Sequence, residues 1–248
     1  QIVAVVKYLS ELAVREGIKP KSLWQEPLEK NIGVEDIINK YKIGKRTKIE
    51  IPLGMVDDPY RQQQYPFFMS IQKENNYLIV GTSGSGKTPF IQTMLYMLAR
   101  DYSSEQVNFY ILDFSSRTLN AFRNLPHCGA VLMDENEGEI EQVVSLLEAM
   151  VEERKVLFAE TEVSNYDSYI KANMIPLIVL VIDNLSGIEE FKKGREILER
   201  ITNLMKNGAS YGIKVVASIS NLNDCLYRMQ HEFSMMICLL YTSDAAAD

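Results

Sequence analysis

A glycine-rich segment, Gly81-Thr82-Ser83-Gly84-Ser85-Gly86-Lys87-Thr88, limits the choice of fold for this chain, because it fills every position of the pattern G-x-x-x-x-G-K-[ST]. The residues before it, 77–80, are short and apolar, as expected for a buried strand. The residues after it, 90–100, carry apolar side chains at helical spacing. The sequence therefore predicts a strand, a phosphate-binding loop and a helix in succession. A chance glycine loop at a helix end explains the filled pattern and its flanks less well.

The residue types in this segment suit a nucleoside triphosphate. Glycines let successive backbone N–H groups converge on one anion, and the following helix adds its positive N-terminal end. We expect Lys87 to reach the β- and γ-phosphates, and the hydroxyl of Thr88 to ligate Mg²⁺. ATP and Mg²⁺ are thus the predicted cofactors. The predicted nucleotide-binding residues are Gly81, Thr82, Ser83, Gly84, Ser85, Gly86, Lys87 and Thr88.

A second motif supplies a carboxylate. The run Pro176-Leu-Ile-Val-Leu-Val-Ile-Asp183 is a continuous apolar strand that ends in an acid. Such a strand brings its aspartate to the edge of the sheet beside the phosphate loop, where it holds Mg²⁺ directly or through water. We therefore predict a metal site formed by Thr88 and Asp183. In isolation, the same run would indicate only a core strand with a solvated aspartate.

Composition excludes several other classes of protein. The chain has 248 residues, of which 46% are hydrophobic, enough for one full core. Its net charge of −7 does not suit a protein that covers nucleic-acid phosphates. Its three cysteines share no metal or disulfide spacing, which indicates reduced thiols. No apolar run is long enough to span a membrane. Because the first residue is Gln rather than Met, we expect a fragment of a longer protein.

The pattern of elements predicts an α/β fold. Apolar strands are expected at 48–53, 77–80, 108–113, 129–133, 175–182, 212–218 and 233–237, with a turn at 54–59. Helices are expected at 138–160, 195–210 and 224–230. Strands alternating with helices imply a mainly parallel central sheet covered on both faces, of the RecA-like phosphate-loop type.

Three segments are expected along the chain. Residues 1–48 are predicted to form a helical interdomain linker, with helices at 2–15 and 33–41 and a loop around Trp24. Residues 49–237 are predicted to form the nucleotide-binding domain. Residues 238–248, Cys-Leu-Leu-Tyr-Thr-Ser-Asp-Ala-Ala-Ala-Asp, resemble a translated sequencing adapter and are predicted to be a non-native tail.

With both motifs placed, the chain resembles the FtsK/SpoIIIE group of P-loop ATPases over roughly residues 50–237. Besides the two nucleotide motifs, the resemblance rests on Leu125-Pro126-His127 after the second strand of the domain, and on Glu153-Arg154-Lys155 late in the long helix. Within the group it is most similar to C-terminal ATPase modules of the membrane-anchored motors of type VII secretion. The segments that point there are Ile51–Pro59, Tyr110–Phe114, Leu125–Gly129 and Val181–Asn184.

The resemblance implies an ATP-binding motor module that couples nucleotide state to protein secretion. The implied partners are small helical secreted proteins of the WXG100 type and neighbouring ATPase modules of the same chain. An oligomer is expected, with a hexamer as one form, and the implied location is the cytoplasmic face of the cell membrane, where this fragment itself would be soluble. The alternative is a DNA translocase motor of the FtsK/SpoIIIE kind. The acidic composition argues against it, as does the loss of a glutamine from the Ala-Thr-Gln-Arg-Pro segment of DNA pumps, here Ala217-Ser-Ile-Ser-Asn221.

A departure from the active translocases concerns catalysis. Asn184 stands where they carry a glutamate, and an amide cannot act as a general base. Hydrolysis is therefore expected to be weak or regulatory, unless another acid substitutes. Candidates are Asp113, at the end of a neighbouring strand, and Glu189 or Glu190 beyond Asp183.

Polar residues also follow the strand after Asp183. Ser218, Ser220 and Asn221 are expected either to sense the γ-phosphate or to form an ordinary strand-end turn. The sequence leaves these two interpretations open. Ser220 and Asn221 are accordingly added to the candidate catalytic residues.

Overall fold

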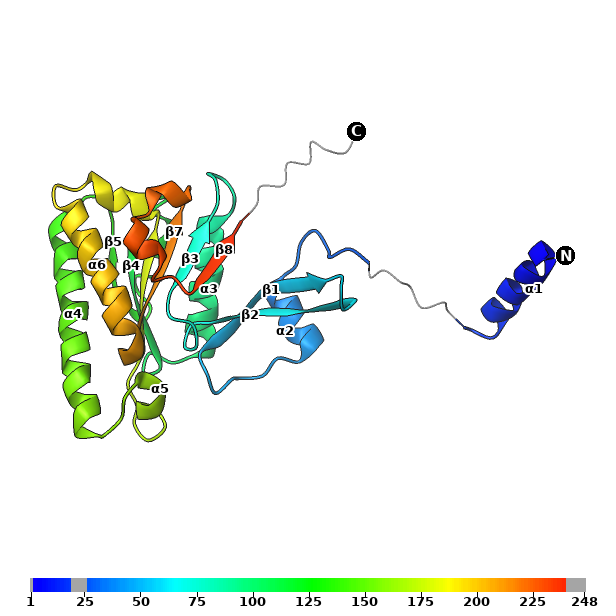
Figure 1. Cartoon of the computed structure of the whole chain (residues 1–248), viewed down its shortest axis with the longest axis horizontal. Helices are drawn as coiled ribbons and strands as arrows, with labels where there is room; N and C mark the ends of the chain where they lie inside the picture. The colour runs from blue at the N-terminus through cyan, green and yellow to red at the C-terminus, as the bar shows by residue number, and fades with distance from the viewer. Residues whose placement is uncertain (1, 19–25, 240–248) are drawn as a thin grey trace. The chain divides into compact units, whose positions relative to one another are not determined.

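The computed structural model of the chain describes residues 2–18 and 26–239 (Figure 1). The chain forms two compact units. One contains Gln1–Ile43 and Gly54–Phe67, and the other contains Gly44–Leu53 and Phe68–Asp248. The predicted loop around Trp24 lies outside the described residues for 19–25, and the predicted tail of 238–248 does so for 240–248. Cys238, the first residue of that tail, is described and ends a strand of the larger unit.

The larger unit is built on a six-stranded sheet in which every pairing is parallel. The strands in sheet order are β5 (Cys128–Leu132), β4 (Val107–Asp113), β6 (Leu177–Asp183), β7 (Ile213–Ile219), β3 (Tyr77–Val80) and β8 (Met235–Cys238). All six were predicted to within a few residues. Strands β6 and β7 are buried along their whole length, because continuous apolar sequences suit a sheet covered on both faces.

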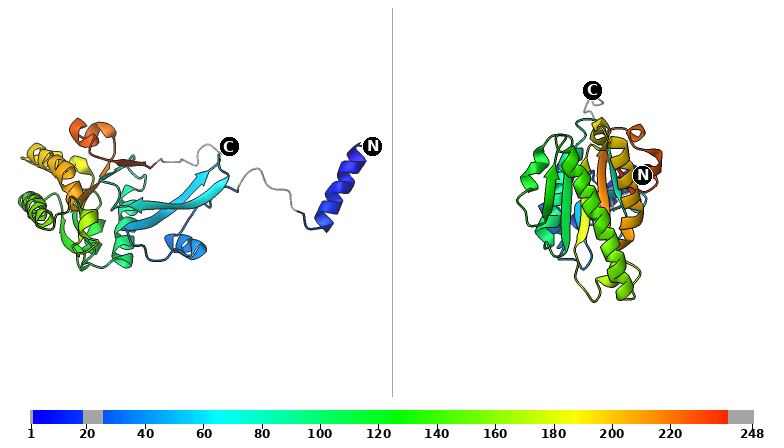
Figure 2. Two further views of the ribbon diagram at one scale, coloured as in Figure 1. Left: turned by 60° about the horizontal axis from the view of Figure 1, so that its bottom comes forward. Right: turned by 90° about the vertical axis from the view of Figure 1, so that its left-hand side faces the viewer.

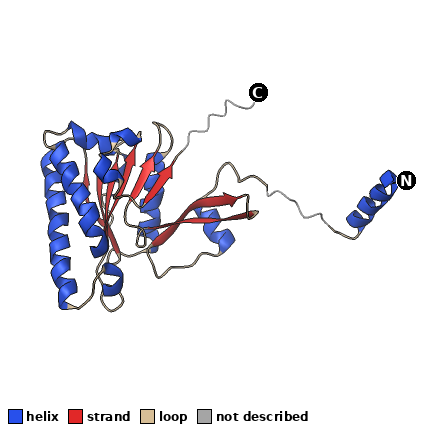
Figure 3. Cartoon of the chain, in the orientation of Figure 1, coloured by secondary structure: helices blue, strands red, loops and turns tan. Residues whose placement is uncertain are grey.

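Helices flank this sheet, as Figures 2 and 3 show. Helices α4 (Glu137–Glu160) and α6 (Gly194–Gly208) share one core with alternate residues of the strands, such as Leu180 and Val215. Helix α3 (Lys87–Asp101) buries a separate set of apolar residues and packs against β6. The predicted α/β architecture is therefore confirmed, with both faces of the sheet covered.

Short helices complete the larger unit. They are η1 (Thr118–Phe122), α5 (Tyr166–Tyr169), η2 (Leu185–Glu190), η3 (Ala209–Tyr211), η4 (Leu222–Asp224) and α7 (Tyr227–Gln230). The single helix predicted at 224–230 is wrong in detail, because η4 and α7 are separate. The three cysteines, Cys128, Cys225 and Cys238, are not paired with one another.

The strands between residues 48 and 70 differ from the prediction. Strand β1 runs from Glu50 to Asp58, so the turn expected at 54–59 is wrong. The chain turns at 59–62 instead and returns as β2 (Gln63–Ser70), a strand that was not predicted. Gly54 and the two aspartates weaken the strand pattern, but pairing of β1 with β2 overrides this local preference.

The two helices expected before residue 48 are present. Helix α1 spans Ile2–Arg15 and buries none of its residues, whereas α2 (Val34–Tyr41) buries Ile37. Over the described ranges of the chain, no helix combines the length and the apolar character needed to cross a membrane.

Candidate nucleotide site

The site lies where parallel strands end side by side. Strand β3 ends at Val80 and leads into the glycine-rich loop, while Asp183 is the last residue of β6. Strand β7 lies between β3 and β6, and Ser218 near its end is in register with Ile79. Because parallel strands present their carboxyl ends at one edge, the loop and Asp183 meet there as predicted.

The glycines of the loop are needed for two different reasons. Gly84 and Gly86 have φ of +79° and +97°, a backbone region that favours glycine. Gly81 has an ordinary backbone, but a side chain there would collide with that of Ser85. Helix α3 then starts at Lys87, with the N–H of Phe90 donating to the carbonyl of Gly86 at 2.9 Å.

The ammonium group of Lys87 closes the loop. Its Nζ donates to the carbonyl oxygens of Gly81 at 2.7 Å and Thr82 at 3.0 Å, and lies 3.4 Å from Ser220 Oγ. Within the described part of the chain, no carboxylate lies within ion-pair distance of this group. A cation held by neutral oxygens among glycines fits a phosphate, which would supply the missing negative charge.

Thr88 and Asp183 form the second half of the site. The hydroxyl of Thr88 donates to Asp183 Oδ2 at 2.5 Å, and the carboxylate is completely buried. A hydroxyl and a carboxylate in contact are the oxygen ligands that Mg²⁺ accepts. Among the residues the structure describes, no group of three or more His, Cys, Asp or Glu side chains could hold a metal. A metal at this point would therefore depend on Thr88, Asp183 and oxygens of the nucleotide.

A cavity of about 330 Å³ opens above these residues. The described residues that line it are Ser83, Gly84, Gly86, Lys87, Thr88, Pro89, Ser115, Asn184 and Ser220. Five of the eight predicted loop residues are in this set, and none of the lining residues is an aspartate or glutamate. The sequence analysis did not identify Ser115 as a site residue. Its position two residues after Asp113, which ends a neighbouring strand, could have indicated it.

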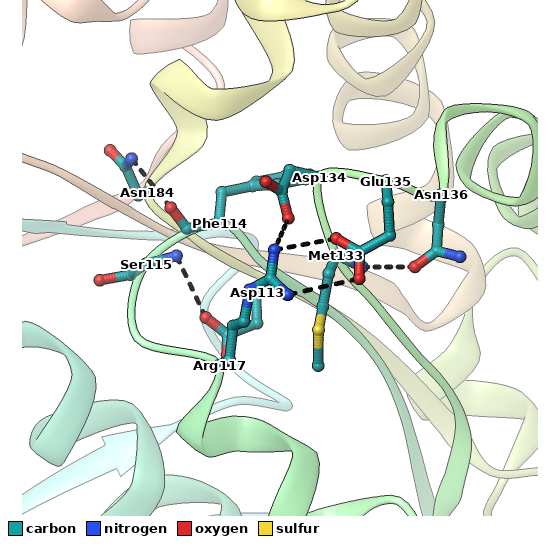
Figure 4. A network of polar contacts seen from close by, with 9 residues as sticks. All are labelled: Asp113, Phe114, Ser115, Arg117, Met133, Asp134, Glu135, Asn136 and Asn184. Carbon is teal, nitrogen blue, oxygen red and sulfur yellow. Dashed lines mark hydrogen bonds and ion pairs between the residues drawn. The ribbon is translucent and has the colours of Figure 1, made fainter.

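Asp113 holds the backbone of the adjoining loop (Figure 4). Its Oδ1 accepts from the N–H of Ser115 at 3.1 Å. Its Oδ2 accepts from the N–H of Leu119 at 3.0 Å. The carboxylate is buried and does not line the cavity. The structure therefore brings Asp113 to the correct edge of the sheet, and gives it a visible task in shaping the loop that carries Ser115.

The other candidate catalytic residues are dispersed. Glu189 is exposed in η2, and its charge adds to burial in raising the pKa of the Cys225 thiol to about 11. Ser220 lines the cavity next to Lys87. Asn221 is exposed, and its Oδ1 accepts from the N–H of Asn223 at 3.0 Å. Only Ser220 of these three is brought to the cavity.

Asn184 adopts a left-handed backbone with φ of +69°. Its N–H donates to Ser218 Oγ at 2.9 Å, and its side-chain amide donates to the carbonyl of Phe114 at 3.3 Å (Figure 4). Asparagine adopts this backbone region more readily than most residues with a side chain. The residue thus links the end of β6 to β7 and to the loop after β4.

An ion-pair network borders the same edge. Arg117 donates to Asp134 at 2.7 Å and to Glu135 at 3.0 Å, which joins the loop after β4 to the loop after β5 (Figure 4). All three side chains are more than half exposed, so the pairs contribute little to stability. The pairs connect the loop after β4, which carries Ser115, to the loop after β5.

The fold and the loop together define a domain of the RecA-like phosphate-loop class. The chain belongs to the FtsK/SpoIIIE family, whose sequence model matches residues 42–224. This confirms the family inferred from the two motifs.

Two relatives of this chain are proteins of type VII secretion systems. The ESX-5 secretion system protein EccC5 of Mycobacterium marinum is 29% identical over 223 residues, covering 82% of this chain and 16% of its own length. The type VII secretion system protein EssC of Staphylococcus aureus strain MRSA252 is 26% identical over 225 residues, covering 88% of this chain and 15% of its own. The chain therefore spans only about a sixth of the length of these relatives.

Solved structures of this group have the same fold. EssC (ATPases 2 and 3) from Geobacillus thermodenitrificans gives a TM-score of 0.76 at 23% identity, covering 89% of this chain and 42% of that one. EccC (ATPases 2 and 3) of Thermomonospora curvata, in complex with a signal sequence peptide, gives 0.72 at 23% identity, covering 81% and 37%. The predicted RecA-like class is confirmed by these matches.

Proposed function

We propose that this chain is an ATP-binding module of a type VII protein secretion ATPase, with hydrolysis that is weak or regulatory. The observation that carries the proposal is the contact between Thr88 and Asp183 beside the loop closed by Lys87. That arrangement unites an anion cradle and a pair of oxygen ligands for Mg²⁺ at one edge of the sheet. Both halves come from sequence motifs that are complete.

Each residue has a separate task in this proposal. The backbone N–H groups of residues 81–88 and the ammonium group of Lys87 bind the phosphates of ATP. Thr88 and Asp183 hold Mg²⁺, which supplies charge neutralisation when bound. Gly84 and Gly86 supply the backbone conformation that the cradle needs.

The cavity lining supports weak turnover. A general base must lie within hydrogen-bond reach of the attacking water, directly or through one further water. Asn184 occupies the expected place, but its amide is turned to the carbonyl of Phe114. No described lining residue is an acid. Asp113, Glu189, Ser220 and Asn221 remain the candidate catalytic residues. Of these, Ser220 lines the cavity, with its Oγ 3.4 Å from the ammonium group of Lys87.

The setting of the module is proposed from its relatives. They are secretion-system proteins about six times as long as this chain, and two solved relatives contain ATPases 2 and 3 in one molecule. We infer neighbouring ATPase modules in a membrane-anchored parent protein, located at the cytoplasmic face of the membrane and assembled as an oligomer, with a hexamer as one form. Small helical secreted proteins of the WXG100 type are the proposed substrates, docking as a helix in a groove.

The experiment that tests the function is a paired measurement on the full chain. ATP affinity and Mg²⁺-dependent turnover are measured for the unaltered chain, Lys87→Ala and Asn184→Glu. The unaltered chain is expected to bind ATP tightly with little turnover, and Lys87→Ala to bind it at least about tenfold more weakly. Asn184→Glu is expected to raise turnover, because it restores a carboxylate as general base. Robust turnover by the unaltered chain would show that another group acts as base, and the regulatory interpretation would be wrong.

A DNA translocase motor is the second candidate function. The net charge of −7 and Ile219 at the glutamine position of DNA pumps both weigh against it. Addition of double-stranded DNA to the turnover assay distinguishes the two, because a translocase is stimulated and a secretion module is not.

A further inference from the structure

Ser218 lies at the centre of the strand ends and does not contact the cavity. It belongs to β7, between the strand that precedes the phosphate loop and the strand that ends in Asp183. Its side chain is completely buried, whereas Ser220, two residues later, is exposed. The interpretations offered by the sequence, a phosphate sensor or a strand-end turn, do not fit a buried strand residue.

The hydroxyl of Ser218 uses its donor and an acceptor position at once. Its Oγ donates to Asp183 Oδ1 at 2.6 Å, and it accepts from the N–H of Asn184 at 2.9 Å. A serine hydroxyl has one proton to donate, so this proton is committed to Asp183. One side chain of β7 is thereby joined to Asp183, the last residue of β6, and to Asn184, which follows it.

The bond fixes a rotation that the backbone leaves free. The terminal torsion of an aspartate is broad, so its two oxygens are not oriented by rotamer preference alone. With Oδ1 held by Ser218, Oδ2 points to Thr88, which donates to it at 2.5 Å. Burial makes this arrangement important, since a buried carboxylate oxygen without a donor is costly.

We propose that Ser218 is a positioning residue, which orients Asp183 toward Thr88 and so sets how strongly Mg²⁺ tightens nucleotide binding. The inference rests on the proposed ATP site. It assigns to Ser218 no contact with nucleotide or metal. Phosphate binding by Lys87 and the loop backbone does not require it, so only the metal-dependent part of the affinity depends on Ser218.

The test is the ratio of two dissociation constants for a fluorescent ATP analogue, measured on the full chain in EDTA and in Mg²⁺. We expect Ser218→Ala to leave the constant in EDTA within about twofold, while the ratio falls about tenfold, as loss of one charge-assisted hydrogen bond implies. Ser218→Thr keeps the hydroxyl and is expected to keep the ratio. Ser210→Ala, an exposed serine of η3 outside the nucleotide cavity, is the matched control.

The outcomes separate this inference from the proposed function. A ratio in Ser218→Ala equal to that of the unaltered chain would overturn the positioning role while leaving the ATP site intact. Absence of binding by the unaltered chain, or undiminished binding by Lys87→Ala, would overturn both. Circular dichroism checks that each variant is folded. Should Ser218→Ala fail to fold, Ser218→Cys keeps the shape with only a weak donor and carries the same prediction.

Discussion

The hydroxyl of Thr88 donates to the carboxylate of Asp183 although 95 residues separate them along the chain. The bond joins the first turn of α3 to the end of β6, and Asp183 is fully buried. Asp183 therefore depends on Thr88 for this hydrogen bond, whereas Thr88 is half-buried and lines the cavity.

This pair predicts a stability effect that does not require a ligand. Thr88→Ala leaves Asp183 Oδ2 without its donor, and the free energy of unfolding is expected to fall by about 1–3 kcal/mol. Thr88→Ser keeps the hydroxyl and is expected to lose less than about 1 kcal/mol. Urea denaturation of the two variants measures this difference, and equal stability of the two would show that the bond does not form.

The backbone of Asn184 predicts the cost of restoring a glutamate there. With φ of +69°, Asn184→Glu places a residue in a region where side chains other than Asn and Asp are strained, at roughly 1–2 kcal/mol. Asn184→Gly relieves that strain and is expected to stay within about 1 kcal/mol of the unaltered chain. Chemical denaturation distinguishes the two. A glutamate variant as stable as the glycine variant would contradict the observed backbone conformation.

Because Lys214 is buried, we expect the free energy of unfolding to rise with pH. The side chain of Lys214 is only 5% exposed, and burial lowers its pKa to about 8, against 10.5 in an unfolded chain. Between these values the unfolded chain binds more protons than the folded one, so stability increases as pH rises from 8 to 10.5. The difference in unfolding free energy between the unaltered chain and Lys214→Met should change by roughly 3 kcal/mol across this window. A constant difference would contradict the depressed pKa.

Substitution of the buried Arg154 is expected to cause a large loss of stability. Arg154 belongs to the Glu153-Arg154-Lys155 triplet that helped to indicate the family, and its guanidinium donates to the carbonyls of Pro176 at 2.7 Å and Tyr211 at 2.7 Å. It is buried, and this burial lowers its pKa. Arg154→Met leaves these carbonyls unpaired, so we expect a loss of about 3 kcal/mol or more.

The matched control for that experiment is Arg195→Met. Arg195 lies on α6 with its side chain almost fully exposed, in a long ion pair with Glu199 at 3.6 Å. Its loss is expected to cost less than about 0.5 kcal/mol. Thermal unfolding compares the two variants, and a small effect of Arg154→Met would show that the buried bonds are dispensable.

The sequence predicted the sheet, the phosphate loop and Asp183 because these depend on local patterns. Apolar runs specify buried strands, and the loop needs glycines at fixed spacing. The extension of β1 to Asp58 and the existence of β2 were not predicted, since the pairing between them outweighs the preferences of Gly54 and the neighbouring acids.

The positions of single side chains were harder to predict. Ser218 and Ser220 are alike in the sequence, but strand geometry buries the first against Asp183 and leaves the second beside Lys87. Asp113 was predicted correctly at the end of its strand. Its bonds to the N–H groups of Ser115 and Leu119 depend on the path of the following loop, which no local pattern encodes.

Calorimetric titration of the full chain with ATP in the presence of Mg²⁺, beside Lys87→Ala, is the most direct test of the proposed site. Lys87 donates to the carbonyls of Gly81 and Thr82 and stands ready to neutralise phosphate. We predict saturable binding at one site per chain, weakened at least about tenfold in Lys87→Ala, since charge-assisted hydrogen bonds to phosphate are lost. Equal affinity of the two proteins, or no binding by the unaltered chain, would contradict the assignment of this loop as a nucleotide site.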